Sequence, residues 1–184
     1  MRMLVLVVGP SGAGKDTLMD AARARLGADP RFRWVRRVVT RPAEAGGEDH
    51  EPADPETFAA RRDAGGFALS WEAHGIAYGI PADIAADLAS GRVVVANGSR
   101  TVIADAATRF PTMVIEVTAP AEVLAARLAG RGREDAADIA ERLARAVPMP
   151  DGVAIVRIDN GGALADAEVA MVAALTRAAS AARQ

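Results

Sequence analysis

Residues 9–17 of the chain read Gly9-Pro10-Ser11-Gly12-Ala13-Gly14-Lys15-Asp16-Thr17. They follow the apolar run Met3–Val8, which is typical of a strand buried on both faces of a parallel sheet, and they lead into a helical pattern, Thr17–Leu26. In such a loop the backbone N–H groups point into one concavity, and the helix N-terminus adds a partial positive charge. Strand, glycine spacing and helix together predict a Walker A loop, in which Lys15 contacts the β- and γ-phosphates of a nucleotide.

Lysine occurs at one position only. The 184 residues include 22 basic side chains, of which all but Lys15 are arginine, and 24 acidic ones. A bias in the coding DNA towards Ala, Arg, Gly and Pro codons explains why lysine is scarce, but not why the remaining lysine lies in the predicted loop. A phosphate loop needs a compact ammonium on a flexible stem, which a planar guanidinium replaces poorly.

The remaining composition excludes several classes of protein. A chain of this length is most simply a single domain with a sizeable core. The absence of cysteine excludes disulfides, thiolate metal sites and a cysteine nucleophile. A formal net charge of −2 argues against nucleic-acid binding, and no apolar run approaches the ~20 residues of a membrane span. We therefore expect a cytoplasmic protein without nucleic-acid or membrane partners. The oligomeric state stays open, a homodimer included.

The rest of the chain alternates between β-rich and helical patterns. Further strands are expected at Trp34–Val39, Phe67–Trp71, Gly75–Gly79, Val93–Ala96, Met113–Val117 and Val153–Ile158. Helices are expected from the N-cap Asp54 to Gly65, from Pro81 to Gly91, and near residues 100–109, 120–129, 135–146 and 163–182. This alternation predicts an α/β fold with a mainly parallel sheet flanked by helices.

Asp16 stands where a Walker A loop normally has the Ser or Thr that ligates Mg²⁺. Two interpretations are open: Asp16 contacts the metal directly or through water, or it is an acidic residue favoured by the helix dipole. No strand ends in a Walker B aspartate, since Asn97 follows Val93–Ala96. We expect Mg²⁺ to be held largely by nucleotide phosphates and water, with Asp16 as its candidate protein ligand.

A second arginine-rich segment joins two predicted helices. It reads Arg127-Leu128-Ala129-Gly130-Arg131-Gly132-Arg133-Glu134, and Arg142 lies on the helix that follows. Guanidinium groups carried by a loop suit a lid over phosphates, because phosphoryl transfer needs positioning and charge neutralisation. The alternative is a set of solvated arginines, which the abundance of arginine favours for any single residue.

In order and spacing these motifs resemble the guanylate kinase family over nearly the whole chain. The matching segments are residues 9–17, Thr40-Arg41, Gly47-Glu48, residues 74–81 and residues 127–143. The resemblance implies a P-loop nucleoside-monophosphate-kinase-like fold in one domain. Its core would be residues 1–32, 92–127 and 143–184, with an acceptor-binding segment at 33–91 and a lid at 128–142.

The same resemblance implies roles for single residues. Lys15, Arg131 and Arg142 would be catalytic, the two arginines holding the transferring phosphoryl group. Arg127 and Asn160 would join the loop in binding ATP, with Asn160 near the adenine.

On the acceptor side, Arg41 and Tyr78 would by this resemblance bind the acceptor phosphate, with Glu48 and His50 beside them. His50 lies in a polar loop next to two acids, so a solvated histidine is the alternative to a substrate contact. For His74, which precedes a glycine turn, a hydrogen-bonded structural role is favoured.

Three departures from the family argue against GMP as the acceptor. The family has a second arginine three residues after the position of Arg41, and here it is Glu44. The family glutamate that reads guanine would fall at Leu69. An acidic pair near residues 96–99 is replaced by a segment that starts at Asn97. Guanine N–H donors would then lack their carboxylate acceptors, and a buried site that hydrogen-bonds its substrate rejects analogues by ~10⁴ or more.

These departures resemble one branch of the family, the ribose 1,5-bisphosphate phosphokinases. The matching residues are Gly14-Lys15-Asp16, Glu48-Asp49-His50, residues 68–71, residues 95–100 and residues 131–134. The resemblance implies a small sugar-phosphate substrate and the formation of 5-phosphoribosyl 1-diphosphate from ATP during phosphonate use. Asn97, Ser99 and Arg100 would read the ribose hydroxyls and the second phosphate.

Two other functions remain under consideration. One is a guanylate or other nucleoside monophosphate kinase with altered base reading. The other is a non-catalytic guanylate-kinase-like interaction module, which would be expected to lose Lys15 and the lid arginines. A regulatory GTPase is weaker still, because no second lysine is present to form its Asn-Lys-x-Asp motif.

Overall fold

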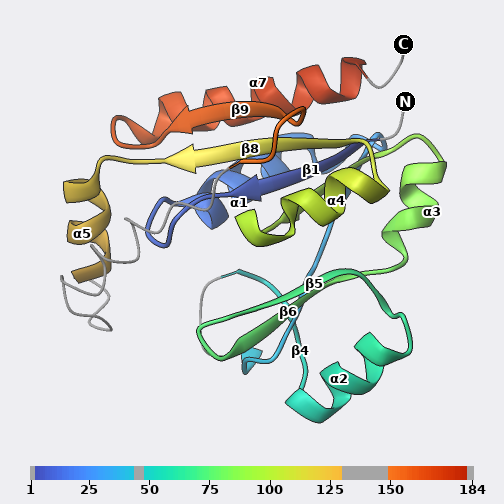
Figure 1. The fold of residues 1–184 in the computed structure, drawn as a ribbon. Coiled ribbons are helices and arrows are strands. Elements are labelled where there is room, and N and C mark those ends of the chain that lie inside the picture. The colour runs from blue at the N-terminus through green and yellow to red at the C-terminus, as the bar shows by residue number, and fades with distance from the viewer. Residues whose placement is uncertain (1–2, 44–47, 130–148, 182–184) are drawn as a thin grey trace.

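The computed structural model describes residues 3–43, 48–129 and 149–181 of the chain. The helix expected at 135–146 and most of the predicted lid lie outside these ranges. Two sheets form the described part, the larger one above the smaller one in the view of Figure 1.

The larger sheet has five parallel strands in the order β2-β7-β1-β8-β9. They are β1 (Met3–Val8), β2 (Phe32–Trp34), β7 (Val93–Asn97), β8 (Thr112–Thr118) and β9 (Ala154–Asp159). The helices are α1 (Lys15–Leu26), α2 (Pro55–Asp63), α3 (Ile84–Ala89), the 3-10 turn η2 (Arg100–Val102), α4 (Ile103–Arg109), α5 (Ala121–Ala129) and α7 (Leu164–Ala181). The predicted α/β fold with a mainly parallel sheet is confirmed.

Strand β1 is buried on both faces, as its continuous apolar run predicts. Val5 and Val7 join the core cluster formed with α1 and α7, while Leu4 and Leu6 join the cluster on the opposite face with α3 and α4. Figure 1 shows α7 above this sheet and α4 below it. Each buried aliphatic side chain contributes roughly 1.5–3 kcal/mol relative to exposure, so β1 anchors the loop that follows it.

The smaller sheet has the order β4-β3-β6-β5 and lies below α4 in Figure 1. Its strands are β3 (Val38–Val39), β4 (Glu51–Pro52), β5 (Phe67–Ala73) and β6 (Ile76–Pro81). Helix α2 packs on it through Phe58, whose ring stacks on Phe67 at 4.6 Å between centroids. The predicted N-cap is confirmed, since the Asp54 carboxylate accepts a hydrogen bond from the Thr57 N–H at 2.8 Å.

Two predicted elements are wrong. The single strand expected at Trp34–Val39 is split, because the chain leaves the larger sheet after β2 and enters the smaller one at β3. Pro81 ends β6 instead of opening a helix, and α3 begins only at Ile84. Proline lacks a backbone N–H, so it is tolerated at a strand end, where no ladder bond is needed.

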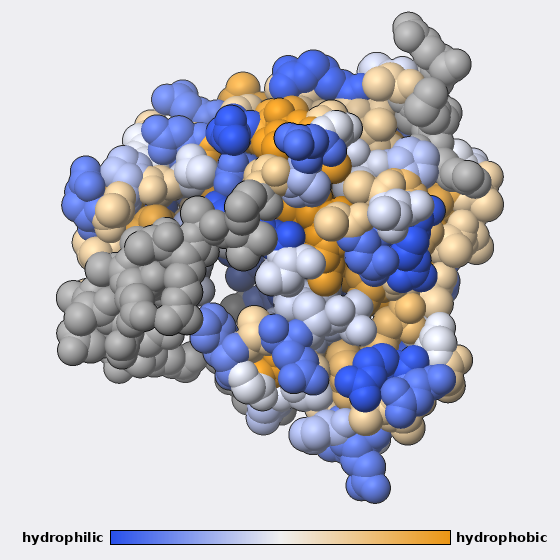
Figure 2. Space-filling model, in the orientation of Figure 1, coloured by the Kyte–Doolittle hydropathy of each residue, from blue (hydrophilic) through white to orange (hydrophobic). Residues whose placement is uncertain are grey.

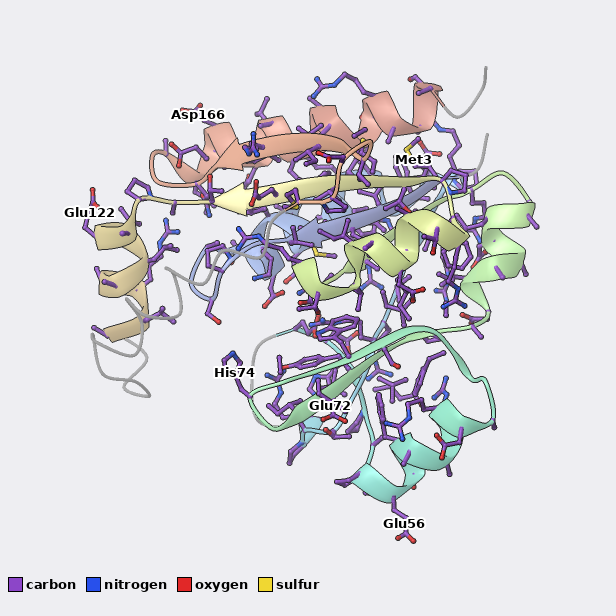
Figure 3. The ribbon with its side chains drawn as sticks, viewed as in Figure 1. Met3, Glu56, Glu72, His74, Glu122 and Asp166 are labelled. Carbon is purple, nitrogen blue, oxygen red and sulfur yellow. The ribbon has the colours of Figure 1, made fainter. Side chains whose placement is uncertain are left out.

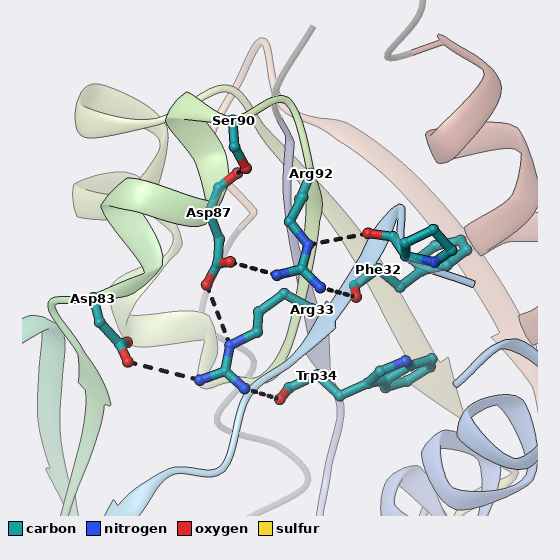
Figure 4. A network of polar contacts seen from close by, with 8 residues as sticks. Phe32, Arg33, Trp34, Asp83, Asp87, Ser90 and Arg92 are labelled. Atoms are coloured by element: carbon teal, nitrogen blue, oxygen red, sulfur yellow. Dashed lines mark hydrogen bonds and ion pairs between the residues drawn. The ribbon is translucent and has the colours of Figure 1, made fainter. Parts of the chain in front are cut away.

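A charged network ties β2 to α3 where the chain crosses between the sheets (Figure 4). The guanidinium of Arg33 contacts Asp87 at 3.2 Å and Asp83 at 3.7 Å, and Arg92 donates to Asp87 at 2.7 Å. Arg33 also donates to the Trp34 carbonyl at 3.2 Å. The network therefore fixes the direction in which the acceptor segment leaves the core.

Within the described ranges, no helix has both the length and the apolar character that a membrane crossing requires. Figure 2 shows hydrophilic and hydrophobic residues interspersed over the visible face, which is hollowed between the two sheets.

Candidate active site

The predicted phosphate loop lies at the carboxyl end of β1, the central strand of the larger sheet. Gly9 has φ +153°, and a Cβ there would clash with the carbonyl oxygen of Val117. Gly14 has φ +86°, and a Cβ there would lie 2.5 Å from Nδ2 of Asn160. The loop approaches β8 and the end of β9 so closely that only glycine fits both positions.

Lys15 begins α1 and folds back over the loop. Its Nζ donates hydrogen bonds to the carbonyl oxygens of Gly9 at 2.9 Å and Pro10 at 3.1 Å. The ammonium therefore lies at the mouth of the glycine-rich turn, where the motif predicts it.

Four charged side chains act on this lysine. Burial lowers the pKa of Lys15, the carboxylates of Asp16 and Glu48 oppose that shift, and the guanidinium groups of Arg37 and Arg100 add to it. A desolvated cation gains most from an added anion, so a phosphate group is the ligand that this position favours.

Two side chains hold the loop from behind. Asn160 follows β9, is buried, and donates from Nδ2 to the Ala13 carbonyl at 2.7 Å. Arg127, on α5, donates to the Gly12 carbonyl at 3.2 Å and to the Asn160 carbonyl at 2.8 Å. Both residues were predicted to bind ATP. Their observed contacts position the backbone of the loop, and direct ATP contacts of either residue, including the adenine contact of Asn160, stay predictions.

Facing the loop is a chain of four polar side chains from distant segments. Asn97, at the end of β7, donates from Nδ2 to Asp16 at 2.8 Å and to Glu48 at 3.2 Å. Glu48 in turn accepts from Arg37, from Nε at 2.9 Å and also from Nη2. Asn97 and Arg37 are buried, so this chain of contacts joins the phosphate loop to the acceptor segment away from solvent.

An aromatic pair lies under the Arg37 guanidinium. Trp71 on β5 stacks on Tyr78 on β6 with ring centroids 5.4 Å apart and an interplanar angle of 11°. The Arg37 guanidinium carbon lies 5.3 Å from the Trp71 centroid and 4.8 Å from that of Tyr78. Tyr78, predicted to bind the acceptor phosphate, therefore lies beside a cation.

The loop before β4 carries Arg41 and His50. His50 is buried, and its ring nitrogens lie 3.0 Å from the Glu48 carbonyl and 3.0 Å from the Arg41 carbonyl. The solvated alternative for His50 is thus wrong, because its ring closes this loop. Arg41 Nε is buried without a hydrogen-bond partner among the described residues, which leaves it available to an anion.

His74 is exposed at the tip of the β5–β6 hairpin with φ 54° (Figure 3). Its ring has no hydrogen-bond partner in the described ranges, so the hydrogen-bonded role expected for it is wrong.

Arg100 also belongs to an ion cluster near the end of β8. Glu116 accepts from Arg100 at 2.7 Å and from Arg157 at 2.9 Å. Burial alone would raise the pKa of Glu116, but these two hydrogen bonds outweigh it and hold the pKa below its ordinary value. Ser99 caps η2, its Oγ accepting from the Thr101 N–H at 3.3 Å.

The structure brings most of the predicted residues together and adds two. Arg37 has no motif that would announce it. Glu116 interrupts an apolar strand, and such an isolated buried charge signals an oppositely charged partner. Leu69 is buried in the core at 2% exposure, so an apolar side chain occupies the position where the family has its guanine-reading glutamate. Arg131, Arg142 and Glu44 lie outside the described residues.

Asp16 is the described residue that best fits a Mg²⁺ ion. One of its carboxylate oxygens accepts from Asn97, which leaves the other for a hard cation beside phosphates. Among the described residues, no group of three or more His, Cys, Asp or Glu side chains could hold a metal. The donor set suits an ion held mainly by nucleotide oxygens and water.

Solved structures define the fold class. The chain superimposes on the guanylate kinase of Anaplasma phagocytophilum with a TM-score of 0.67 at 16% identity, covering 99% of this chain and 85% of that one. It superimposes on a gluconokinase of Sinorhizobium meliloti with a TM-score of 0.53 at 21% identity, covering 97% and 94%. The fold is therefore guanylate-kinase-like. No family model matches the chain.

Curated relatives identify the family. The chain is 56% identical to the ribose 1,5-bisphosphate phosphokinase of Acidiphilium cryptum, covering 83% of this chain and 82% of the relative, and 44% identical to that of Agrobacterium fabrum, covering 96% and 97%. The chain belongs to the ribose 1,5-bisphosphate phosphokinase family, as its motifs predicted. It also matches the bifunctional ribose 1,5-bisphosphokinase-thymidine phosphorylase of Azorhizobium caulinodans at 51% identity, and spans 23% of that protein's length.

Proposed function

We propose that the protein transfers the γ-phosphoryl group of ATP to ribose 1,5-bisphosphate. An oxygen of the 1-phosphate attacks the γ-phosphorus, the bond between that phosphorus and ADP breaks, and the products are 5-phosphoribosyl 1-diphosphate and ADP. The observation that carries the proposal is an intact, clamped phosphate loop in a member of this family.

The nucleotide side supports phosphoryl transfer. Lys15 would exchange its backbone partners for β- and γ-phosphate oxygens, while Asn160 and Arg127 hold the loop still. The lid arginines Arg131 and Arg142 would add charge to the transferring group. We assign Mg²⁺ to the phosphates and the free oxygen of Asp16, where the ion would neutralise phosphate charge.

The acceptor side supports an anionic substrate. Arg41 has an unpartnered Nε and follows β3 closely, and the last residue of β3, Val39, pairs with Tyr78 on β6. The acceptor is an already ionised phosphate, since its second pKa is about 6, so no strong general base is needed. Asn97, Ser99 and Arg100 would read the ribose hydroxyls and second phosphate, the last two beside the Glu116 cluster.

A place in phosphonate breakdown and a cytoplasmic location belong to the same proposal. The place in phosphonate breakdown comes from the resemblance to ribose 1,5-bisphosphate phosphokinases, and the cytoplasmic location fits a substrate and a phosphoryl donor that are intracellular metabolites.

The test is an ADP-release assay with ATP and Mg²⁺ that compares ribose 1,5-bisphosphate, GMP, AMP and ribose 5-phosphate. We expect kcat/KM for ribose 1,5-bisphosphate to exceed that for GMP by ~10⁴ or more. A preference for GMP would contradict the substrate assignment and favour the nucleoside monophosphate kinase. No turnover with any acceptor would favour the non-catalytic module.

A further inference from the structure

Arg37 has no role in the reaction described so far, yet it occupies the centre of the acceptor side. Its side chain is 8% exposed, and its guanidinium lies over both rings of the Trp71–Tyr78 stack. Tyr78 is the residue expected at the acceptor phosphate, so the guanidinium lies inside the acceptor site. Arg37 also lies close enough to Lys15 to act on its charge.

The guanidinium is held firmly in this place. Its Nε and Nη2 donate to Glu48, and Glu48 is held by Asn97 at 3.2 Å. This ion pair does not use Nη1, the third nitrogen. A planar cation fixed along one edge and stacked on its face presents its remaining N–H groups in one direction.

We propose that Arg37 determines acceptor specificity: its guanidinium covers the aromatic pair that a nucleobase would need for stacking, and it offers its free edge to a sugar phosphate. This inference rests on the proposed function. A nucleoside monophosphate brings one phosphate and a flat base, so it loses a stacking surface here. A sugar bisphosphate brings a second anion, which pairs with the desolvated cation.

Three variants test this role. Arg37→Ala uncovers the rings, and Arg37→Met keeps the apolar stem but removes the charge. Either change removes the ion-pair partner of Glu48. The double variant Arg37→Met/Glu48→Gln removes both charges and serves if the single variants unfold at a lower temperature. Arg36→Ala is the matched control, since Arg36 is the neighbouring arginine, is 54% exposed, and pairs only with Asp49 in the described ranges.

The first measurement is the ratio of kcat/KM for ribose 1,5-bisphosphate to kcat/KM for GMP. We expect this ratio to fall about 10- to 100-fold in the Arg37 variants and to stay unchanged in Arg36→Ala. If the ratio stays within about twofold while both values fall together, Arg37 serves packing alone and the inference is overturned. The preference of the unmodified protein tests the proposed function, whereas the change in the ratio tests Arg37.

The second measurement needs no turnover. In a Trp34→Phe background Trp71 is the single remaining tryptophan. GMP or AMP should quench its fluorescence in the Arg37→Ala variant and leave it unchanged when Arg37 is present. Equal quenching in both proteins would show that the guanidinium does not exclude a base.

Discussion

The phosphate loop and the acceptor side are held by different kinds of contact. In the loop, the side chains of Lys15, Asn160 and Arg127 donate to backbone carbonyls. On the acceptor side the His50 ring also contacts backbone carbonyls, but the contacts that lead to the phosphate loop join one side chain to another, as in the ion pair of Arg37 with Glu48.

This difference decides how each region responds to change. A backbone carbonyl is present whatever residue carries it, so the loop keeps its shape as long as its glycines and its clamps remain. A side-chain pair fails when either partner changes, because the other is left buried and unpaired. Specificity is therefore easier to alter on the acceptor side than nucleotide binding is in the loop.

The largest effect should come from Lys15→Ala. We expect kcat to fall at least about 10²- to 10³-fold, because a charge at the transferring phosphates is lost. Thermal unfolding should change little, since the Gly9 and Pro10 carbonyls can accept from water. Lys15→Arg keeps the charge and should still lose most activity, owing to its bulkier planar group. An unchanged kcat in the ADP-release assay would overturn the loop assignment.

Asn97→Asp tests the acceptor side, and its effect on the free energy of unfolding should be the next largest. It removes the donor to Asp16 and Glu48 and brings a third carboxylate against two others. We expect the free energy of unfolding at pH 7 to fall by about 1.5–3 kcal/mol, measured by urea titration. Asn97→Ala removes the same donor without adding a charge, so it should be less destabilised than Asn97→Asp.

Asn160→Ala tests the clamp. The buried Ala13 carbonyl loses its partner, so we expect about 1–3 kcal/mol less stability and a raised KM for ATP. Asp159→Ala is the control, because Asp159 is exposed and bonds only to the Gly161 N–H among the described residues. Equal losses in both variants would assign the effect to the end of β9 and not to the clamp.

The smallest effect is expected from Glu116→Gln, and it depends on pH. The folded-state pKa of Glu116 is held below its ordinary value. The stability that its carboxylate contributes to the folded protein is therefore complete above the unfolded pKa of about 4.3, and it is lost as the pH falls through the folded-state pKa. At pH 7 the variant should be less stable by about 1 kcal/mol. Urea titrations should show the two proteins converging below about pH 4, and a constant difference would contradict the assignment.

The fold and the nucleotide side could be predicted from local patterns, and the acceptor side could not. The apolar run Met3–Val8 and the loop after it are contiguous, so their order on the chain already places them in space. Glu48 lies 11 positions after its partner Arg37 and 49 positions before its partner Asn97. No local periodicity in the sequence pairs residues over such separations. The misplaced strand at Trp34–Val39 has the same origin, because a change of sheet leaves no mark in a β-branched run.

The single lysine also gives the protein a chemical handle. Amine-reactive reagents attack the unprotonated amine, and burial lowers the pKa of Lys15, so more of it is unprotonated at neutral pH than of an ordinary lysine. In this chain such a reagent can acylate one ε-amino group, besides the terminal amine. The fraction of the Lys15 peptide that carries the label therefore measures how much of the phosphate loop is free, without any assay of turnover.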